Sequence, residues 1–449
     1  MKKIISLVVL VILFFFGFKG WQYYSENDLY AHYISKAYWE SLDSDVDNGY
    51  TDQTSYEPGE LQKVYIDAKK SGQTYLKLYD VDNLAVDSVK AVIKKQDRGN
   101  NPSEEGYGYE STFTYEVPAI KSGLYLWEKS IPFIIKAKKK EEIVVLYPTN
   151  TINAYNITGG KSLYSLFSEQ THVVSFLRPT FPAVSFQVQA GIKYLKRLTN
   201  FPQAYITDQD MENYTSLSGA KLLIIIGHSE YWTRKARLNF DRFVESGGNV
   251  LILSGNTMWW QVRYENNMSQ MVCYKELPDP VDDKLLTTTF WTNEILEYPV
   301  IPSIGVDFPH GGFGRKYEGS FKGLKVIAPN SPVFKETQVK NGQVIDLPTK
   351  EYDGTLLTNT AATPLLDTAN LPFYKVELLA YDHAYSEDKG FGTFIIFQKT
   401  QTSGTIINTG TMDWCSQYGL GGKDSTLLEK ITYNMIEGLL EGEDLFSHM

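Results

Sequence analysis

Uninterrupted apolar runs in the second half of the chain predict strands that are buried on both faces. Three such runs are present, at residues 143–148, 220–227 and 249–255. Strands with this pattern are typical of a parallel sheet that is covered by helices. Residues 234–246 lie between the last two runs, have helical apolar spacing and end at Gly247-Gly248, as a helix C-cap favours. The sequence therefore predicts a βαβ unit within a mainly parallel sheet.

The same region contains further segments with helix or strand patterns. Apolar spacing predicts helices at residues 186–198 and 425–440, and short apolar runs predict strands at 205–207, 392–397 and 404–408. With the three buried runs, these segments predict an α/β domain over residues 141–449.

Residues 57–140 show a different pattern, in which short segments alternate between apolar and polar positions. These segments lie at residues 64–68, 74–79, 111–117, 123–127 and 132–135. Several short strands at such spacing are typical of a β-sandwich. We therefore predict a β-sandwich domain over residues 57–140, preceded by a polar and aromatic spacer over residues 21–56.

The first residues of the chain have the pattern of an export signal. Lys2 and Lys3 precede an apolar run from Ile4 to Phe18, which is the layout of a signal sequence. The run is shorter than the about twenty residues of a relaxed transmembrane helix, and no clear cleavage site follows it. We predict that residues 1–20 are a signal sequence or an N-terminal membrane anchor. The protein is then anchored and faces outside, or is periplasmic or secreted if the segment is cleaved.

Charge and cysteine content exclude some classes of function. The chain has 43 Lys and Arg against 53 Asp and Glu, a net charge of −10. Nucleic-acid binding requires a basic face, so we expect no nucleic-acid partner. Cys273 and Cys415 are the two cysteines of the chain, and their spacing does not predict a zinc site. They could form one disulfide bridge or remain buried thiols.

Polar residues follow several of the predicted buried strands. Ligands of an open parallel sheet bind beyond the carboxyl ends of its strands, and His228 and Glu230 directly follow one such strand. They could act as a base and its partner or as metal ligands; alternatively, Glu230 caps the next helix and His228 packs. Asn256 follows the next strand and is a candidate substrate-binding residue. Trp259 either forms the wall of a pocket or belongs to the core.

A set of motifs resembles a known family. In chain order the motifs are Thr151-x-x-Ala-Tyr155-Asn156, Gly159-Gly160-x-Ser162-Leu-Tyr164, Ser175-Phe176-x-Arg178-Pro179, His228-Ser-Glu230-Tyr231-Trp232, Gly247-Gly248 and Gly255-Asn256 with an aromatic pair. This order resembles the large (β) subunit of N,N-dimethylformamidase and the family that shares its C-terminal domain. The resemblance covers about residues 57–449. It implies a β-sandwich followed by a flavodoxin-like α/β domain similar to class I glutamine amidotransferases.

The resemblance also implies a site. A mononuclear iron is expected between two tyrosine phenolates and one glutamate, for the hydrolysis of an amide. By motif, Glu230 resembles the glutamate ligand and His228 the assisting histidine, while Tyr155 resembles one phenolate ligand and Tyr125 the second. Asn156 is a further candidate for substrate binding. Phenolates and carboxylates are hard donors that suit a trivalent cation.

Three classes of function follow from these observations. The first is an extracytoplasmic, metal-dependent hydrolase of C–N bonds, whose substrate is a small-molecule or surface amide. Because the chain carries an export pattern, dimethylformamide itself is not the expected substrate. The second is a non-catalytic protein that binds glycans or another envelope component. The third is a metal-free hydrolase with Cys415 as nucleophile, although no histidine is adjacent to it in the sequence.

Overall fold

The computed structural model describes residues 44–165, 168–276, 278–314, 319–359, 363–386 and 388–447. It is a mixed α/β protein in which strands hold more residues than helices. The predicted signal or anchor at residues 1–20, and residues 21–43 of the predicted spacer, lie outside the described residues. Within the described part of the chain, no helix is both long and apolar enough to cross a membrane.

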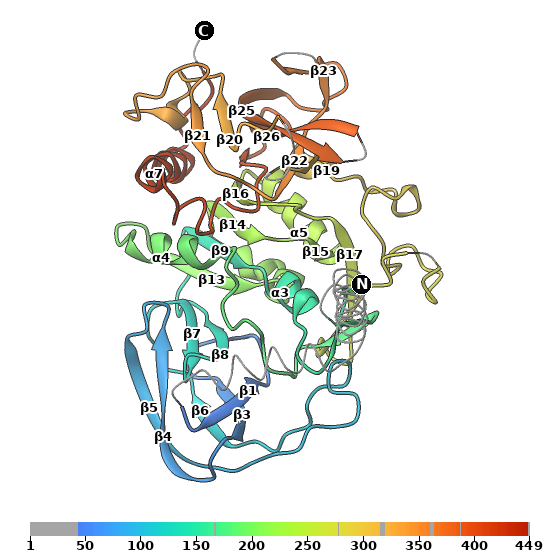
Figure 1. Ribbon diagram of the computed structural model, residues 1–449. Coiled ribbons are helices and arrows are strands. Elements are labelled where there is room, and N and C mark those ends of the chain that lie inside the picture. The colour runs from blue at the N-terminus through green and yellow to red at the C-terminus, as the bar shows by residue number, and fades with distance from the viewer. Residues whose placement is uncertain are drawn as a thin grey trace, which may run out of the picture.

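Two mainly antiparallel sheets form the N-terminal sandwich, drawn in blue to teal in Figure 1. One sheet has the order β1 (Val46–Thr51), β3 (Leu61–Ala68), β6 (Phe113–Glu116). The other has the order β2 (Ser55–Tyr56), β8 (Ile131–Ile135), β7 (Gly123–Trp127), β4 (Gly72–Asp80), β5 (Ala85–Ile93), and in it β2 alone pairs in parallel. Both sheets contribute to one buried core that includes Val64, Leu78 and Trp127. The prediction that residues 46–56 belong to a spacer is wrong, because β1 and β2 pair into these sheets.

The largest sheet begins with a parallel half that contains the predicted apolar runs. Its order is β13 (Gln203–Thr207), β9 (Ile143–Tyr147), β14 (Leu222–His228), β16 (Asn249–Gly255), β27 (Thr405–Asn408). All four neighbouring pairs are parallel. Every residue of β9 and β14 is buried, as continuous apolar runs predict.

The other half of this sheet is antiparallel. After β27 it continues with β26 (Asp388–Gln398), β25 (Lys375–Ser386), β19 (Asp307–Phe313) and β22 (Glu351–Gly354), and β20 (Gly323–Val326) joins β25 and β21 (Val344–Asp346). The prediction of a mainly parallel sheet therefore holds for one half of this sheet only. The physical reason is that β25 and β26 follow each other almost directly in the chain, and such a short connection permits antiparallel pairing alone.

Helices cover both faces of the parallel half, as Figure 1 shows. One face carries α4 (Gln189–Arg197) and α7 (Ser425–Glu441), and the other carries α5 (Arg234–Glu245). Alternation along β14 places Ile224 in the core beneath α4 and α7, and Ile225 in the core beneath α5. This alternation follows from the two-residue period of a strand. The predicted buried strands and helices are therefore found where expected.

Shorter elements complete the described chain. A side sheet has the order β12 (Val173–Ser175), β18 (Gln270–Val272), β17 (Trp260–Glu265), β15 (Tyr231–Thr233). The other short strands are β10 (Lys161–Ser162), β11 (Glu169–Gln170), β23 (Leu357–Asn359) and β24 (Leu365–Leu366), and the short helices are α3 (Thr149–Tyr155) and α6 (Ile301–Ile304). Four 3-10 turns are η1 (Asp210–Glu212), η2 (Tyr214–Leu217), η3 (Glu294–Leu296) and η4 (Pro332–Phe334).

A close approach of two backbones makes Gly404 a sensitive position. A Cβ at residue 404 would lie 1.9 Å from the carbonyl oxygen of Gly248. We predict that Gly404→Ala lowers the free energy of unfolding by about 3 kcal/mol through overpacking, as measured by urea denaturation. Gly99→Ala is the matched control, since its Cβ would come no nearer than 3.8 Å to its neighbours. Equal stability of the two variants would contradict the close approach.

Candidate active site at the carboxyl ends of the parallel strands

The candidate site begins where two neighbouring buried strands end. β14 ends at His228 and β16 ends at Gly255, which are paired in the sheet. Gly227, just before His228, has a φ of +79°, and a Cβ there would lie 2.4 Å from Val188 Cγ1. Glycine is therefore required at this position. The resulting turn carries His228 and Glu230 into the protein interior, where both are buried.

A histidine and two carboxylates form the centre of the site. His228 Nε2 lies 3.3 Å from Glu230 Oε2 and 3.6 Å from Glu351 Oε2. One ligand atom from each of the three residues can be chosen so that all lie within 4.8 Å of one another. All three side chains are buried. This cluster could hold a metal ion.

Asn256 holds the two carboxylates together. Its Nδ2 donates to Glu230 Oε1 at 3.0 Å and to Glu351 Oε2 at 3.2 Å. Its backbone has a φ of 51°, in the left-handed region, and its N–H donates to Asp353 Oδ1. Its buried Oδ1 has no hydrogen-bond partner among the described residues. An amide oxygen of this kind can accept from a ligand or a water molecule.

Two stacked tyrosines bring phenol oxygens to the same cluster. The rings of Tyr155, at the end of α3, and Tyr164 stack at a centroid distance of 4.2 Å. The Tyr164 hydroxyl lies 3.3 Å from both carboxylate oxygens of Glu230. The Tyr155 hydroxyl lies 3.5 Å from His228 Nε2. Although 40% of Tyr155 is exposed, its hydroxyl group lies beside the buried cluster and not at the protein surface. Two phenols and a carboxylate converge at this point.

A buried arginine positions the loop that carries both tyrosines. Arg178 is 1% exposed and its guanidinium donates to the carbonyl oxygens of Asn153, Thr158 and Lys161 at 2.7 to 3.0 Å. These residues lie on either side of Tyr155 and shortly before Tyr164. Because the guanidinium is planar and its donors are fixed in direction, this set of bonds holds the loop in one shape.

Burial and charge act in opposite directions on the groups of the site. Burial lowers the pKa of His228, but the charges of Glu230 and Glu351 outweigh it and raise that pKa to about 9. Burial raises the pKa of Glu230, but the neighbouring His228 brings it below its usual value. Burial, followed by the charge of Glu230, raises the pKa of both Tyr155 and Tyr164 far above normal. Without a cation, the site therefore favours an imidazolium, a carboxylate and two neutral phenols.

A lysine adds positive charge at the edge of the cluster. Lys275 Nζ lies 3.3 Å from the centre of the Tyr164 ring, and burial lowers its pKa to about 8. A cation above an aromatic face is attracted to the ring. Lys275 also contributes to the lowered pKa of Glu230, so it helps to keep that carboxylate charged.

An apolar pocket opens over His228 and the Tyr155 ring. It has a volume of about 120 Å³. Its lining residues are Pro148, Thr151, Ile152, Tyr155, Phe181, Pro182, Ser185, Phe186, Gln187, Val188 and His228. Apart from the Tyr155 phenol, His228 is the one ionisable side chain in this lining. Apart from His228 and the Tyr155 hydroxyl, the pocket thus offers a largely apolar surface next to the cluster.

Four of the predicted site residues are brought together by the structure. His228, Glu230, Tyr155 and Asn256 lie within one connected network. The predicted placement of His228 and Glu230 at a strand end is correct. Asn256 contacts the carboxylates, and its assignment to substrate binding stays a prediction.

Tyr125 is not in the site, so the prediction that it is the second phenolate ligand is wrong. It lies in β7 within the sandwich core, and its hydroxyl donates to the carbonyl oxygen of Lys121 at 2.6 Å. The second phenol at the cluster is Tyr164. Tyr164 ends the motif that begins at Gly159, so the signal was present in the sequence.

Asn156 and Trp259 are also placed outside the cluster. The Nδ2 of Asn156 donates to the carbonyl oxygen of Pro179, and its Oδ1 accepts from the N–H groups of Thr158 and Phe181. These bonds give Asn156 a role in loop structure. Trp259 stacks on Phe290 in an aromatic group beyond the cluster. For both residues, substrate binding stays an untested prediction.

Sequence reasoning missed Glu351. It is the first residue of β22. Its approach to His228 depends on pairing at the far edge of the antiparallel half, through β19 and β22. A single acidic residue at a strand start carries no local signal of such a long-range contact.

The two cysteines are free and buried, so they do not form a bridge. Burial raises the pKa of the Cys415 thiol to about 12, and the thiol faces the carbonyl oxygen of Leu253. A reactive cysteine needs an accessible thiolate. This environment argues against Cys415 as a nucleophile.

Comparison with known proteins identifies a family domain. The family model described as N,N-dimethylformamidase beta subunit-like, C-terminal, matches residues 93–425. A search of curated proteins gave no match. The matched segment includes every residue of the cluster described above.

Solved structures with partial similarity were also found. A ThuA-like protein from Bacteroides uniformis is 12% identical, with coverage of 69% of this chain and 96% of that chain and a TM-score of 0.33. A β-galactosidase from Bacillus circulans sp. alkalophilus is 12% identical, with coverage of 68% and 32% and a TM-score of 0.32. The N-terminal domain of mmIFT52 is 14% identical, with coverage of 57% and 91% and a TM-score of 0.26. Scores this low carry no argument about fold or function. The similarity to class I glutamine amidotransferases therefore stays a prediction.

The pKa of His228 predicts a pH dependence of stability in metal-free protein. The pKa is about 9 in the folded state and about 6.5 in an unfolded chain. Protonated His228 therefore contributes stability that is fully present below about pH 6.5 and is lost as the pH rises through about 9. We expect the difference in free energy of unfolding between the wild type and His228→Gln to fall by about 3 kcal/mol over this range. Urea denaturation after chelation measures it, and a difference that does not change with pH would contradict the prediction.

Proposed function

We propose that this chain, which belongs to the N,N-dimethylformamidase beta subunit-like family, is a metal-dependent hydrolase of C–N bonds in amides. The family domain supports a dimethylformamidase-like hydrolase. The observation that carries the proposal is the convergence of Tyr155, Tyr164 and Glu230 at the carboxyl ends of parallel strands. Two phenols and one carboxylate are the donor types expected of the family's iron site.

The residues present fit a trivalent iron. Tyr155, Tyr164 and Glu230 offer hard oxygen donors, and Glu351 is a further carboxylate within the cluster. Burial and the charge of Glu230 raise the pKa of both phenols, whereas a bound cation favours their deprotonated form. When bound, the iron would supply a Lewis acid that polarises an amide carbonyl and acidifies water.

Asn256 and Lys275 maintain the orientation and the charge that the carboxylates need to bind such a cation. Asn256 Nδ2 fixes the orientation of Glu230 and Glu351, so both present oxygens to the same point. Lys275 helps to hold Glu230 in its charged form. Preorganised ligands cost little reorganisation when the ion binds.

His228 is positioned to move a proton. Its Nδ1 lies 2.9 Å from the carbonyl oxygen of Gly255; a carbonyl only accepts, so Nδ1 carries a hydrogen. Nε2 lies 3.3 Å from Glu230 Oε2, and His228 also lines the pocket. In amide hydrolysis, this nitrogen accepts a proton from the attacking water and returns it to the leaving amine. Substitution of a general acid–base group costs about 10²- to 10⁴-fold in rate.

The pocket over His228 supports an uncharged amide as substrate. Ile152, Phe181 and Phe186 give its walls an apolar character, which favours alkyl or aryl substituents over charged ones. Apolar walls also limit the access of bulk water to the reacting group. We further propose that the reaction takes place outside the cytoplasm, as the pattern of residues 1–20 predicts.

The proposal predicts that Glu230→Gln removes both metal and activity. The wild-type chain is expected to contain about one iron per chain and to release amine from a panel of N-alkyl and N,N-dialkyl amides. In Glu230→Gln, we expect loss of the iron and a fall in kcat of at least about 10²-fold. Elemental analysis and amine release are the two measurements.

Tyr125→Phe is the matched control, because it removes a phenol that lies in the sandwich core. It should retain iron and activity. Iron and turnover that survive in Glu230→Gln would refute the proposal. A third outcome is that Glu230→Gln loses the iron but the wild-type protein hydrolyses no amide. That result would indicate a metal site with a different function.

A further inference from the structure

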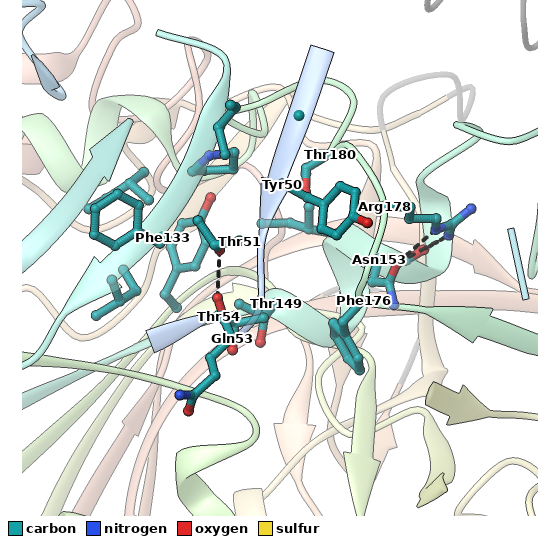
Figure 2. Close-up of a pocket in the computed structure, with 17 residues that line it drawn as sticks. Tyr50, Thr51, Gln53, Thr54, Phe133, Thr149, Asn153, Phe176, Arg178 and Thr180 are labelled. Atoms are coloured by element: carbon teal, nitrogen blue, oxygen red, sulfur yellow. Dashed lines mark hydrogen bonds between the residues drawn. The ribbon is translucent and has the colours of Figure 1, made fainter. Parts of the chain in front are cut away.

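A second cavity lies between the sandwich and the parallel half of the large sheet, and Figure 2 shows it. Its volume is about 50 Å³. Its lining comes from β1, β8, β9, α3 and the segment that contains Arg178. Among the labelled residues of Figure 2, Tyr50 and Phe133 belong to the sandwich, while Asn153 and Arg178 belong to the α/β region. The cavity is distinct from the cluster of His228, Glu230 and Glu351, which we call the metal cluster. Ile152 nevertheless lines both this cavity and the pocket over His228.

Arg178 is the one charged residue among those that line this cavity. Its Nε, Nη1 and Nη2 donate to carbonyl oxygens and to Asn153 Oδ1, which are all neutral acceptors. No carboxylate of the described residues forms an ion pair with it. Its hydrogen bonds are therefore satisfied, but its positive charge is not compensated. A buried charge without a counter-ion is costly.

Two further donors in the lining have no partner. The hydroxyl of Tyr147 and the Nδ2 of Asn153 are buried and make no hydrogen bond within the described residues. Both residues are part of the cavity lining. A buried donor without a partner costs about 1–3 kcal/mol. Together with Arg178, the lining thus offers one positive charge and two free donors.

We propose that this cavity binds a small monocarboxylate anion. A carboxylate has two acceptor oxygens, which match the two free donors, and one negative charge, which matches Arg178. A water molecule needs about 10–15 Å³ of such volume, so the cavity has room for about four heavy atoms. Acetate has this size. The residues involved are outside the metal cluster, and the proposal does not rest on amide hydrolysis.

Calorimetric titration of the full chain with acetate tests the proposal, with acetamide as a neutral ligand of nearly the same shape. Acetate should bind and acetamide should not, because the charge of Arg178 is the larger attraction. Sodium chloride in place of acetate tests whether any small anion suffices. Equal binding of acetate and acetamide, or chloride binding as tight as acetate binding, would overturn the assignment to a carboxylate.

Two variants locate the binding. Asn153→Asp places a carboxylate beside Arg178, whose Nη2 already lies 3.1 Å from Asn153 Oδ1, so we expect loss of acetate binding with the fold retained. Tyr147→Phe should weaken binding about tenfold, because it removes one hydrogen bond to a charged ligand. Tyr205→Phe removes a buried hydroxyl elsewhere and should have no effect.

Glu230→Ala separates this site from the metal cluster, because a bound metal could itself take up acetate. Acetate binding that persists in Glu230→Ala and disappears in Asn153→Asp supports the proposal. Acetate binding that disappears in Glu230→Ala and persists in Asn153→Asp overturns it, and assigns the anion to the metal. Either result is independent of whether amides are hydrolysed.

Discussion

Burial of β14, and of β16 beyond its first residue, is the constraint on which the rest of the structure depends. Helices cover both faces of these strands, so the residues between the strand ends must be apolar or small. Polar groups can enter this part of the interior only where the strands end. His228 and Asn256 stand at those ends, and the turn after Gly227 directs the first of them inward. The position of the site therefore follows from the core.

Charge balance then determines what the site can hold. Glu230 and Glu351 are two buried carboxylates that share His228 and Asn256. Like charges in a low-dielectric interior repel each other strongly, so such a pair requires a cation. In the metal-free protein, protonated His228 supplies one positive charge. A trivalent ion would supply more positive charge. It would also favour deprotonation of the Tyr155 and Tyr164 phenols, which stay neutral in the metal-free protein.

The sequence predicted the parts of this account that depend on local pattern. Apolar runs identified β9, β14 and β16, helical spacing identified α5, and the position of His228 at a strand end followed from chain order. The resemblance assigned the second phenol to Tyr125, although Tyr164 ends the motif that begins at Gly159. The sandwich takes Tyr125 into its own core.

Glu351 and most of the antiparallel half could not be predicted for a related reason. Among its strands, β19 and β20 pair with partners that are distant in the sequence, and only β26 contains an apolar run that predicts a strand. The contact between Glu351 and His228 joins segments more than a hundred residues apart. Local periodicity contains no information on such a contact.

The visible absorption spectrum of the iron-loaded protein tests most directly whether Tyr155, Tyr164 and Glu230 form one metal site. Tyrosinate bound to ferric iron gives a charge-transfer band in the visible range. We expect this band in the wild type, a marked loss or shift of the band in Tyr164→Phe, and an unchanged band in Tyr125→Phe. A band that is absent in the iron-loaded wild type, or that is the same in Tyr164→Phe, would contradict this expectation.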